Sequence, residues 1–231
     1  MATRGFNALL ILTALFSATA GCAVGQRQSF ANVQVAVNHR GTTAIAVAAQ
    51  DRRPYVVNGE KPVTFVGTQR GGFGNPFDVT TQSNAPLVAE LAAVLRRSLS
   101  SSGYKVSMIG TQPSHTRQKL TAALAQTKAN RLVLLTVNEW ATDTYNGTDL
   151  SYYLVLEVLD GAGKVLARSA ARGEDHLGTS LFNPQGVARE AAPEALKSKL
   201  GELINDARVA AALQNTVPAP EGQLLPEGPL R

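Results

Sequence analysis

The chain has 231 residues, 44% of them hydrophobic, and 22 Lys and Arg against 17 Asp and Glu give a net charge of +5. This balance excludes a collagen-like chain and a disordered chain swollen by its own charge. A single cysteine excludes a disulfide framework, and the length indicates one domain with terminal extensions.

The first 21 residues have the composition of a secretory signal peptide. Arg4 is the only charged residue, an apolar run follows at 8–16, and small residues lead to Cys22. The apolar run is shorter than the roughly 20 residues that cross a bilayer as a helix. We therefore expect the mature chain to have no transmembrane helix.

Two cleavage sites compete at the end of this segment. Ala18-Thr19-Ala20 fits the small-x-small site of the general signal peptidase, whereas Thr19-Ala20-Gly21-Cys22 resembles the lipobox of bacterial lipoproteins, with Thr19 where Leu is usual. The position of the only cysteine favours acylation of Cys22, which would hold the protein on a membrane. Ala23 in place of Asp implies, by this resemblance, the periplasmic face of the outer membrane. The alternative is a soluble periplasmic protein with a free thiol.

The remaining sequence divides into a tether, a domain and a tail. Residues 22–43 are rich in Gly, Gln and Asn, which predicts a lipidated cysteine followed by a flexible tether with one possible edge strand at 30–37. A coil of this length has a root-mean-square reach of roughly 25 Å. Periodic apolar residues at 44–213 predict a single domain. Residues 214–231 contain four prolines and predict a disordered tail.

The first half of the domain predicts a β-α-β-α order. Short strands are expected at 44–49 and 62–67, a helix from Asn84-Ala85-Pro86 to Gly103, and a strand at 104–109. Such a strand-helix-strand unit makes a right-handed parallel crossover. The apolar face of the helix comprises Leu87, Leu91, Val94, Leu95 and Leu99. The Gly-rich run 71–76 predicts a mobile loop, and a second helix is expected from about Ser114 to Lys128.

The second half predicts an antiparallel meander and a final helix. Strands are expected at 131–142, 149–159 and 164–172, with a hairpin turn at 160–163. A helical stripe covers 184–213, and Pro193 is expected to divide it into a short and a longer helix. The prediction is therefore an α/β (α+β) domain with a mixed sheet. It has a β-α-β-α start, a three-strand meander and a C-terminal helix packed on one face.

Several segments together resemble a known family. They are the lipobox at Cys22, the helix end Leu95–Leu99 before Gly103-Tyr104, and the strands Leu132–Trp140 and Tyr152–Asp160. From about residue 85 to residue 213 the chain is similar to the YajG-like family of small, uncharacterised Gram-negative envelope lipoproteins. The resemblance implies an envelope lipoprotein with a mixed sheet flanked by helices, and it supplies no catalytic residues.

No motif for catalysis, metal binding or nucleic-acid binding is present in the sequence. His39, His115 and His176 are far apart, and in Glu174-Asp175-His176 only the first and last side chains could converge. No Gly-x-Ser-x-Gly elbow occurs, and basic residues form no stripe. Paired carboxylates at Asp143 and Asp149 flank a turn. We expect no cofactor, no metal, no nucleic-acid partner and no enzymatic activity.

Three aromatic residues are candidates for binding a partner. Trp140, the only tryptophan, and Tyr145 lie in the connection between two strands, and Phe182 lies in the loop 177–184. Amphipathic aromatic side chains on loops are favoured anchors for partners. The alternative is that Trp140 completes the core beneath the final helix and that Phe182 packs under the helix starting at Pro184.

These features predict a membrane-anchored periplasmic lipoprotein that acts as a non-enzymatic binding or assembly module in the cell envelope. It would contact the membrane through acyl chains on Cys22 and an envelope protein through an open sheet edge, where an extended segment of the partner can add a strand. The alternative function is a carrier or sensor of a small molecule or lipid held between the sheet and the helices.

Overall fold

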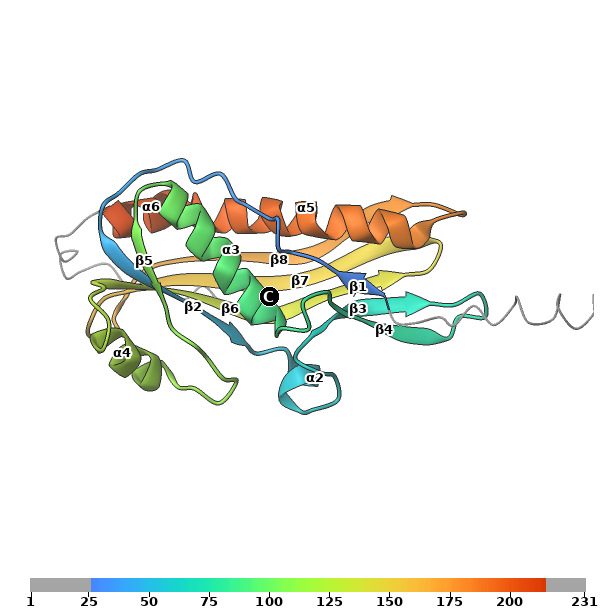
Figure 1. Cartoon of the computed structure of the whole chain (residues 1–231), viewed down its shortest axis with the longest axis horizontal. Coiled ribbons are helices and arrows are strands. Elements are labelled where there is room, and N and C mark those ends of the chain that lie inside the picture. Colours follow the sequence, from blue (N-terminus) through green and yellow to red (C-terminus); the bar gives the residue numbers. More distant parts are fainter. Residues whose placement is uncertain (1–25, 215–231) are drawn as a thin grey trace, which may run out of the picture.

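The computed structural model describes residues 26–214. These residues fold around an eight-stranded mixed sheet. Helices α3, α5 and α6 pack on one face of the sheet and α4 packs on the other (Figure 1). The expected signal peptide, Cys22 and residues 215–231 of the expected tail lie outside the described residues. Between residues 26 and 214, no helix is both long enough and apolar enough to cross a membrane.

The parallel part of the sheet confirms the predicted β-α-β-α start. Strand β2 (Ala44–Asp51) pairs in parallel with β5 (Lys105–Met108) on one side and with β6 (Arg131–Thr144) on the other. Helix α3 (Leu87–Ser101) buries the predicted apolar face, and α4 (Arg117–Ala125) connects β5 to β6. Helix α4 starts three residues later than expected, because Thr116 rather than Ser114 caps it by accepting a hydrogen bond from Lys119 N–H.

The antiparallel meander is also confirmed. Strand β7 (Gly147–Leu159) pairs with β6 and with β8 (Val165–Thr179), and all three strands are long. Their alternating burial places one face against the helices. A bulge at Val137/Glu139 in β6 changes the register halfway along the sheet.

One edge of β6 is shared by two strands. Its first half pairs with β2, and its last three residues pair with β3 (Phe65–Arg70). Strand β3 forms a hairpin with β4 (Pro76–Thr81), and β4 pairs with β1 (Arg27–Gln28). The short helix α2 (Pro54–Val57) lies between β2 and β3 in the sequence. The segment predicted as a mobile loop therefore contains the hairpin turn and the start of a strand that sequence reasoning missed.

Buried charged side chains fill the gap between β2 and β3. Arg53 is fully buried, and its Nε and Nη2 donate to the two carboxylate oxygens of Asp51 at 2.9 and 2.7 Å. Its Nη1 donates to the carbonyl of Phe65 at 2.6 Å and to that of Trp140 at 3.3 Å. The guanidinium group thus satisfies backbone groups at the point where the sheet divides.

Helix α5 (Pro184–Ile204) is continuous through Pro193, so the predicted break is wrong. Proline removes one N–H from the helix ladder, and buried contacts with the sheet on both sides of this position hold the helix together. These contacts come from Ala188, Ala192, Leu196 and Leu200. A second helix, α6 (Ala207–Gln214), follows only after Ile204.

The segment 26–43 is part of the domain and not a free tether. Phe30, Val33 and Val35 are buried in the main core, and the Phe30 ring meets the Trp140 ring edge-on at 6.3 Å between centroids. Farther along, Asn38 N–H donates to Asn205 Oδ1 at 2.8 Å. The edge strand expected at 30–37 does not form, and the apolar residues of this segment instead pack in the core on the helix side of the sheet.

Candidate functional site

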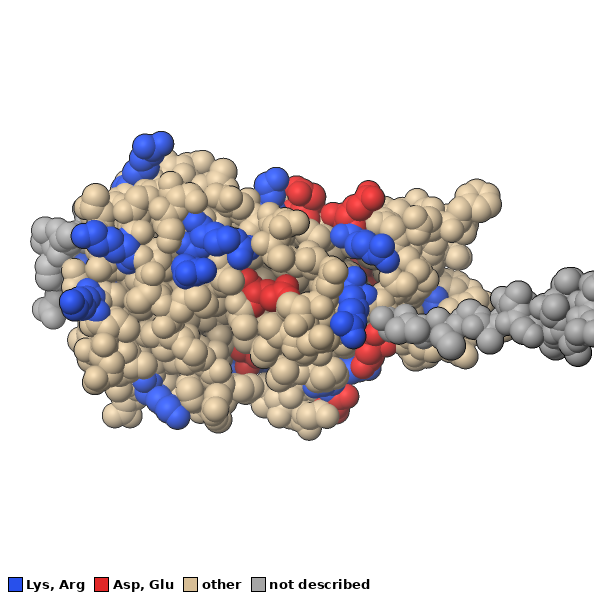
Figure 2. Space-filling view, in the orientation of Figure 1, with Lys and Arg blue, Asp and Glu red and all other residues tan. Residues whose placement is uncertain are grey.

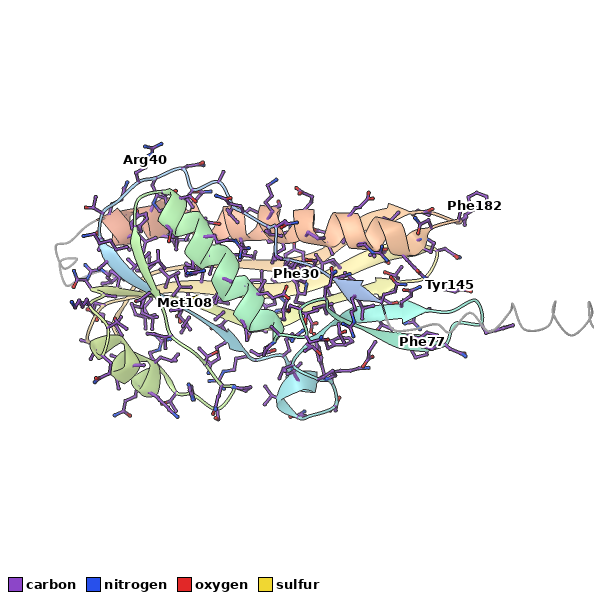
Figure 3. The ribbon with its side chains drawn as sticks, viewed as in Figure 1. Phe30, Arg40, Phe77, Met108, Tyr145 and Phe182 are labelled. Carbon is purple, nitrogen blue, oxygen red and sulfur yellow. The ribbon has the colours of Figure 1, made fainter. Side chains whose placement is uncertain are left out.

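Four exposed apolar side chains lie at one end of the sheet, which we call the apolar end: Phe73, Tyr145, Leu181 and Phe182, with the partly buried Phe77 beside them. They come from the β3–β4 turn with the start of β4, the β6–β7 turn and the β8–α5 loop, and Figure 3 places the labelled members at that end. Phe182 and Phe73 are 100% and 98% exposed, and Leu181 is 76% exposed. Exposed apolar side chains that lie close together, unlike single ones, are typical of sites that bind a protein or a membrane.

Local hydrogen bonds hold these side chains outward. Gly74 N–H donates to the carbonyl of Gly71 at 2.8 Å, and Gly74 has a φ of +81°, which closes the turn under Phe73. The loop before α5 is fixed by Asn183, whose N–H donates to Ser180 Oγ at 3.0 Å and whose Oδ1 accepts from Gly186 N–H at 2.9 Å. The apolar side chains are therefore presented by closed turns.

A shallow hollow of about 380 Å³ joins the loops of the apolar end. Phe77, Tyr145 and the start of α5 line it, together with Gln26, where the described chain begins. Gln26 Nε2 donates to Gln185 Oε1 at 2.7 Å, and Arg189 Nη2 donates to Gln26 Oε1 at 3.0 Å. The chain thus enters the domain at the apolar end and is fixed there.

Two of the three candidate anchors lie together and one does not. Tyr145 (44% exposed) and Phe182 both lie at the apolar end, and the expectation that Phe182 packs beneath α5 is wrong. Trp140 has no exposed surface and packs against Phe30 in the core, so it offers nothing to a partner in this structure. The alternation along β6 turns Trp140 toward the helices, as the alternative interpretation expected. Cys22 lies outside the described residues.

A second feature is the sheet face opposite α5, which we call the polar face. On β8, alternate residues from 168 to 176 are all exposed on it: Arg168, Ala170, Arg172, Glu174 and His176. An open groove of about 840 Å³ crosses this face over β6, β7 and β8. The floor of the groove is a cross-strand row in which Glu139 lies opposite Tyr153, and Tyr153 lies opposite Arg172.

Contacts along this row order its side chains. The Arg172 guanidinium lies over the Tyr153 ring, 5.2 Å from its centroid. Tyr55 Oη donates to Glu139 Oε1 at 2.7 Å. Burial and this hydrogen bond raise the pKa of Tyr55, so its hydroxyl stays protonated and acts as a donor. The row therefore presents one cation, one ring and one carboxylate in a fixed order.

The paired carboxylates near the turn are opposite one another, as their spacing suggested, but each has its own partner. Arg70 binds Asp143 through two hydrogen bonds of 2.9 and 2.6 Å, and the bonded carboxylate raises the pKa of Arg70. Asp149 Oδ1 lies 2.7 Å from His176 Nδ1. Among residues 26–214, no group of three or more His, Cys, Asp or Glu side chains could hold a metal ion.

Strand β8 forms a long edge of the sheet beside the polar face. Within the described residues it pairs only with β7, which leaves its other edge without a neighbouring strand. On the helix side of β8, Lys199 of α5 binds Asp175 at 2.9 Å. Burial lowers the pKa of Lys199, but hydrogen bonds to Asp175 and Tyr152 outweigh this effect and raise it overall. The ion pair fastens α5 to the strand.

Sequence reasoning missed most members of both features. The loops that carry Phe73, Phe77 and Leu181 are close in space but up to about 110 residues apart in the sequence, so no local sequence pattern connects them. One signal was present, because residues 71–77, 145–147 and 180–186 contain no charged residue. The row of Glu139, Tyr153 and Arg172 depends on the bulge in β6, which the alternation alone does not predict.

The fold is a mixed α+β sheet with helices on both faces, and solved structures contain similar arrangements. A DUF330-family protein from Xanthomonas campestris matches with a TM-score of 0.52 at 13% identity, covering 80% of this chain and 96% of that chain. The PelC dodecamer from Paraburkholderia phytofirmans gives 0.42 at 12%, covering 79% and 95%. The LpoB C-terminal domain from Escherichia coli gives 0.31 at 12%, covering 58% and 84%. No family model and no curated protein matches the chain.

Proposed function

We propose that this chain is a membrane-anchored envelope lipoprotein and a non-enzymatic binding or assembly module. Acyl chains on Cys22 anchor it to the periplasmic face of the outer membrane, the role that the resemblance of the sequence to YajG-like lipoproteins implies. The observation that carries the binding role is the polar face, a sheet surface left open beside the long edge of β8.

The partner in this proposal is an extended segment of an envelope protein. It adds to the outer edge of β8 through backbone hydrogen bonds, which supply affinity for any sequence. Specificity comes from the side chains beside that edge, Arg168 and Arg172 above all, which favour acidic or aromatic residues in the partner. The same arginines oppose uncontrolled pairing of two copies, because like charges repel across a strand pair.

The other function considered, a carrier of a ligand held between sheet and helices, has no observation in its favour. That layer is occupied by fully buried side chains such as Leu91, Leu154 and Leu200. The groove on the polar face is open and lined by polar groups, which suits a peptide better than a lipid chain.

Two measurements test the proposal separately. Metabolic labelling with a clickable palmitate analogue is expected to label the wild-type chain and not Cys22→Ser. A photo-crosslinking residue at Arg168 is expected to give a defined envelope adduct that Arg172→Ala weakens, and the same residue at Lys105 on the short edge strand β5 serves as the control. The anchor is refuted by an unlabelled wild-type chain, and the binding role is refuted if both positions give the same adducts.

A further inference from the structure

We propose that the apolar end docks on the phospholipid bilayer, so that Phe73, Leu181 and Phe182 enter the interfacial region of the membrane and Tyr145 lies at the headgroup level. This inference rests on the proposed lipid anchor at Cys22 and deepens it. A domain docked in this way has a fixed orientation on the membrane, whereas a domain held only by a flexible tether has none. Three independent observations carry it.

The first observation is where the chain enters. Gln26 is fixed at the apolar end by hydrogen bonds to Gln185 and Arg189 of α5, and its carbonyl accepts from Thr80 N–H at 3.1 Å. Cys22 is four residues before Gln26. Four extended residues span at most about 14 Å. Acyl chains on Cys22 therefore bring this end of the domain, and no other, to the membrane.

The second observation is the chemistry of the loops at this end. Their exposed members are Phe, Leu and Tyr, the types that partition into the boundary between headgroups and acyl chains. The three loop segments contain no charged residue, and Arg70, which lines the hollow between them, is paired with Asp143. In Figure 2 the upper tip of this end, where Figure 3 labels Phe182, carries no Lys, Arg, Asp or Glu on the visible face.

The third observation is the contrast between the two ends of the meander. The β6–β7 turn at the apolar end reads Tyr145-Asn146-Gly147, whereas the β7–β8 turn at the opposite end is bounded by Asp160 and Lys164. Exposed arginines, Arg27 and Arg189, lie beside the entry point. They lie where the phosphate groups of an anionic leaflet would be. The two ends of the sheet therefore differ in chemistry: the turn at the apolar end is uncharged, and the turn at the opposite end is charged.

The orientation is tested on the lipidated full chain in vesicles of phosphatidylethanolamine and phosphatidylglycerol. The chain has one cysteine, and an acylated Cys22 carries its sulfur as a thioether, so Phe182→Cys can be labelled alone with an environment-sensitive fluorophore. Val165→Cys, 36% exposed beside the opposite turn, is the matched control. Quenching by lipids brominated in the acyl chain is expected for the probe at residue 182 and not for that at residue 165.

The mass of the same preparation reports acylation, so failure of the anchor is seen independently of docking. In the Cys22→Ser chain, Phe73→Ser with Phe182→Ser is expected to lower vesicle affinity about tenfold, while Val57→Ser with Met108→Ser leaves it unchanged. Fluorescence of the buried Trp140 verifies folding in every variant.

Three results overturn the docking proposal. The first is a residue 182 probe that stays unquenched on an acylated chain. The second is equal quenching at residues 182 and 165, since it would mean that the domain has no fixed orientation. The third is a residue 182 probe that becomes buried in the absence of vesicles, to a degree that rises with protein concentration. That result would mean that the apolar end is an interface between copies of this chain.

Discussion

Replacement of Arg53 by Met is expected to destabilise the domain more than replacement of any exposed arginine. Arg53 has no exposed surface, and Asp51, its partner, is 2% exposed. Met keeps much of the side-chain volume but removes the guanidinium hydrogen bonds to Asp51 and to the carbonyls of Phe65 and Trp140, and leaves only the backbone N–H of residue 53 donating to Asp51. The variant thus leaves a buried carboxylate and buried carbonyls without these donors.

The size of the effect follows from the burial of the pair. Removing one partner of a buried ion pair costs about 3–5 kcal/mol, because the remaining charge is desolvated and no longer compensated. With a urea dependence of about 2 kcal/mol/M, the unfolding midpoint is expected to fall by roughly 2 M. The double variant Asp51→Asn with Arg53→Met removes the uncompensated charge and is expected to recover part of the loss.

Urea unfolding followed by Trp140 fluorescence measures the change, and Arg70→Met is the matched control. The Arg70–Asp143 pair has similar hydrogen bonds, but its side chains are 43% and 50% exposed. Exposed pairs contribute about 0–1 kcal/mol. If Arg53→Met and Arg70→Met shift the midpoint equally, the buried pair does not stabilise the sheet where β2 and β3 share one edge of β6, and our reasoning is refuted.

Three further substitutions test other parts of the structure. Trp140→Ala empties a fully buried site and is expected to cost about 3–5 kcal/mol in urea unfolding, followed by circular dichroism because the variant has no tryptophan; a loss under 1 kcal/mol would contradict its place in the core. Gly67→Ala places a Cβ within 2.8 Å of backbone atoms of Thr142 and is expected to lower the thermal midpoint, whereas an unchanged midpoint would contradict the close β3–β6 approach. Hydrogen bonds from Arg208 lower the pKa of Asp206 from 3.8 to about 2, so its stabilisation is present above pH 4 and lost as the pH falls to 2. Asp206→Asn should therefore differ from wild type least at pH 2, and a difference independent of pH would refute this.

Local periodicity was sufficient to predict the meander and the parallel start of the sheet. Alternation is clear along β8 and in the first half of β7, where one face packs on the helices and the other is partly exposed, and this is the condition under which a period of two is visible. The first half of β6 is buried on both faces and was predicted as a strand from its continuous apolar run. The hairpin with β4 was missed because Gly and Pro dominate residues 71–76, and its pairing depends on β1 and β3. The helix break predicted at Pro193 does not occur, because the contacts of α5 with the sheet outweigh the loss of one backbone hydrogen bond.

The candidate site was predictable only in part, for a related reason. Tyr145 and Phe182 stand out as aromatic residues in loops, and both are exposed. Trp140 is likewise an aromatic residue near a turn, but it is buried, and one of the residues that cover it is Phe30, which was assigned to the tether. Residue type identifies a candidate anchor, whereas exposure depends on contacts over long sequence separations.

The first and last described segments are joined to each other, and this has a consequence for biogenesis. Asn205 Nδ2 donates to the carbonyl of Ala36 at 2.9 Å, and Gln214 Nε2 donates to that of Arg40 at 3.2 Å. These contacts span 169 and 174 residues, so they can form only after the segment around residues 205 and 214 has been synthesised. The N-terminal segment 36–40 therefore has no native partner for these carbonyls until translation has passed α6.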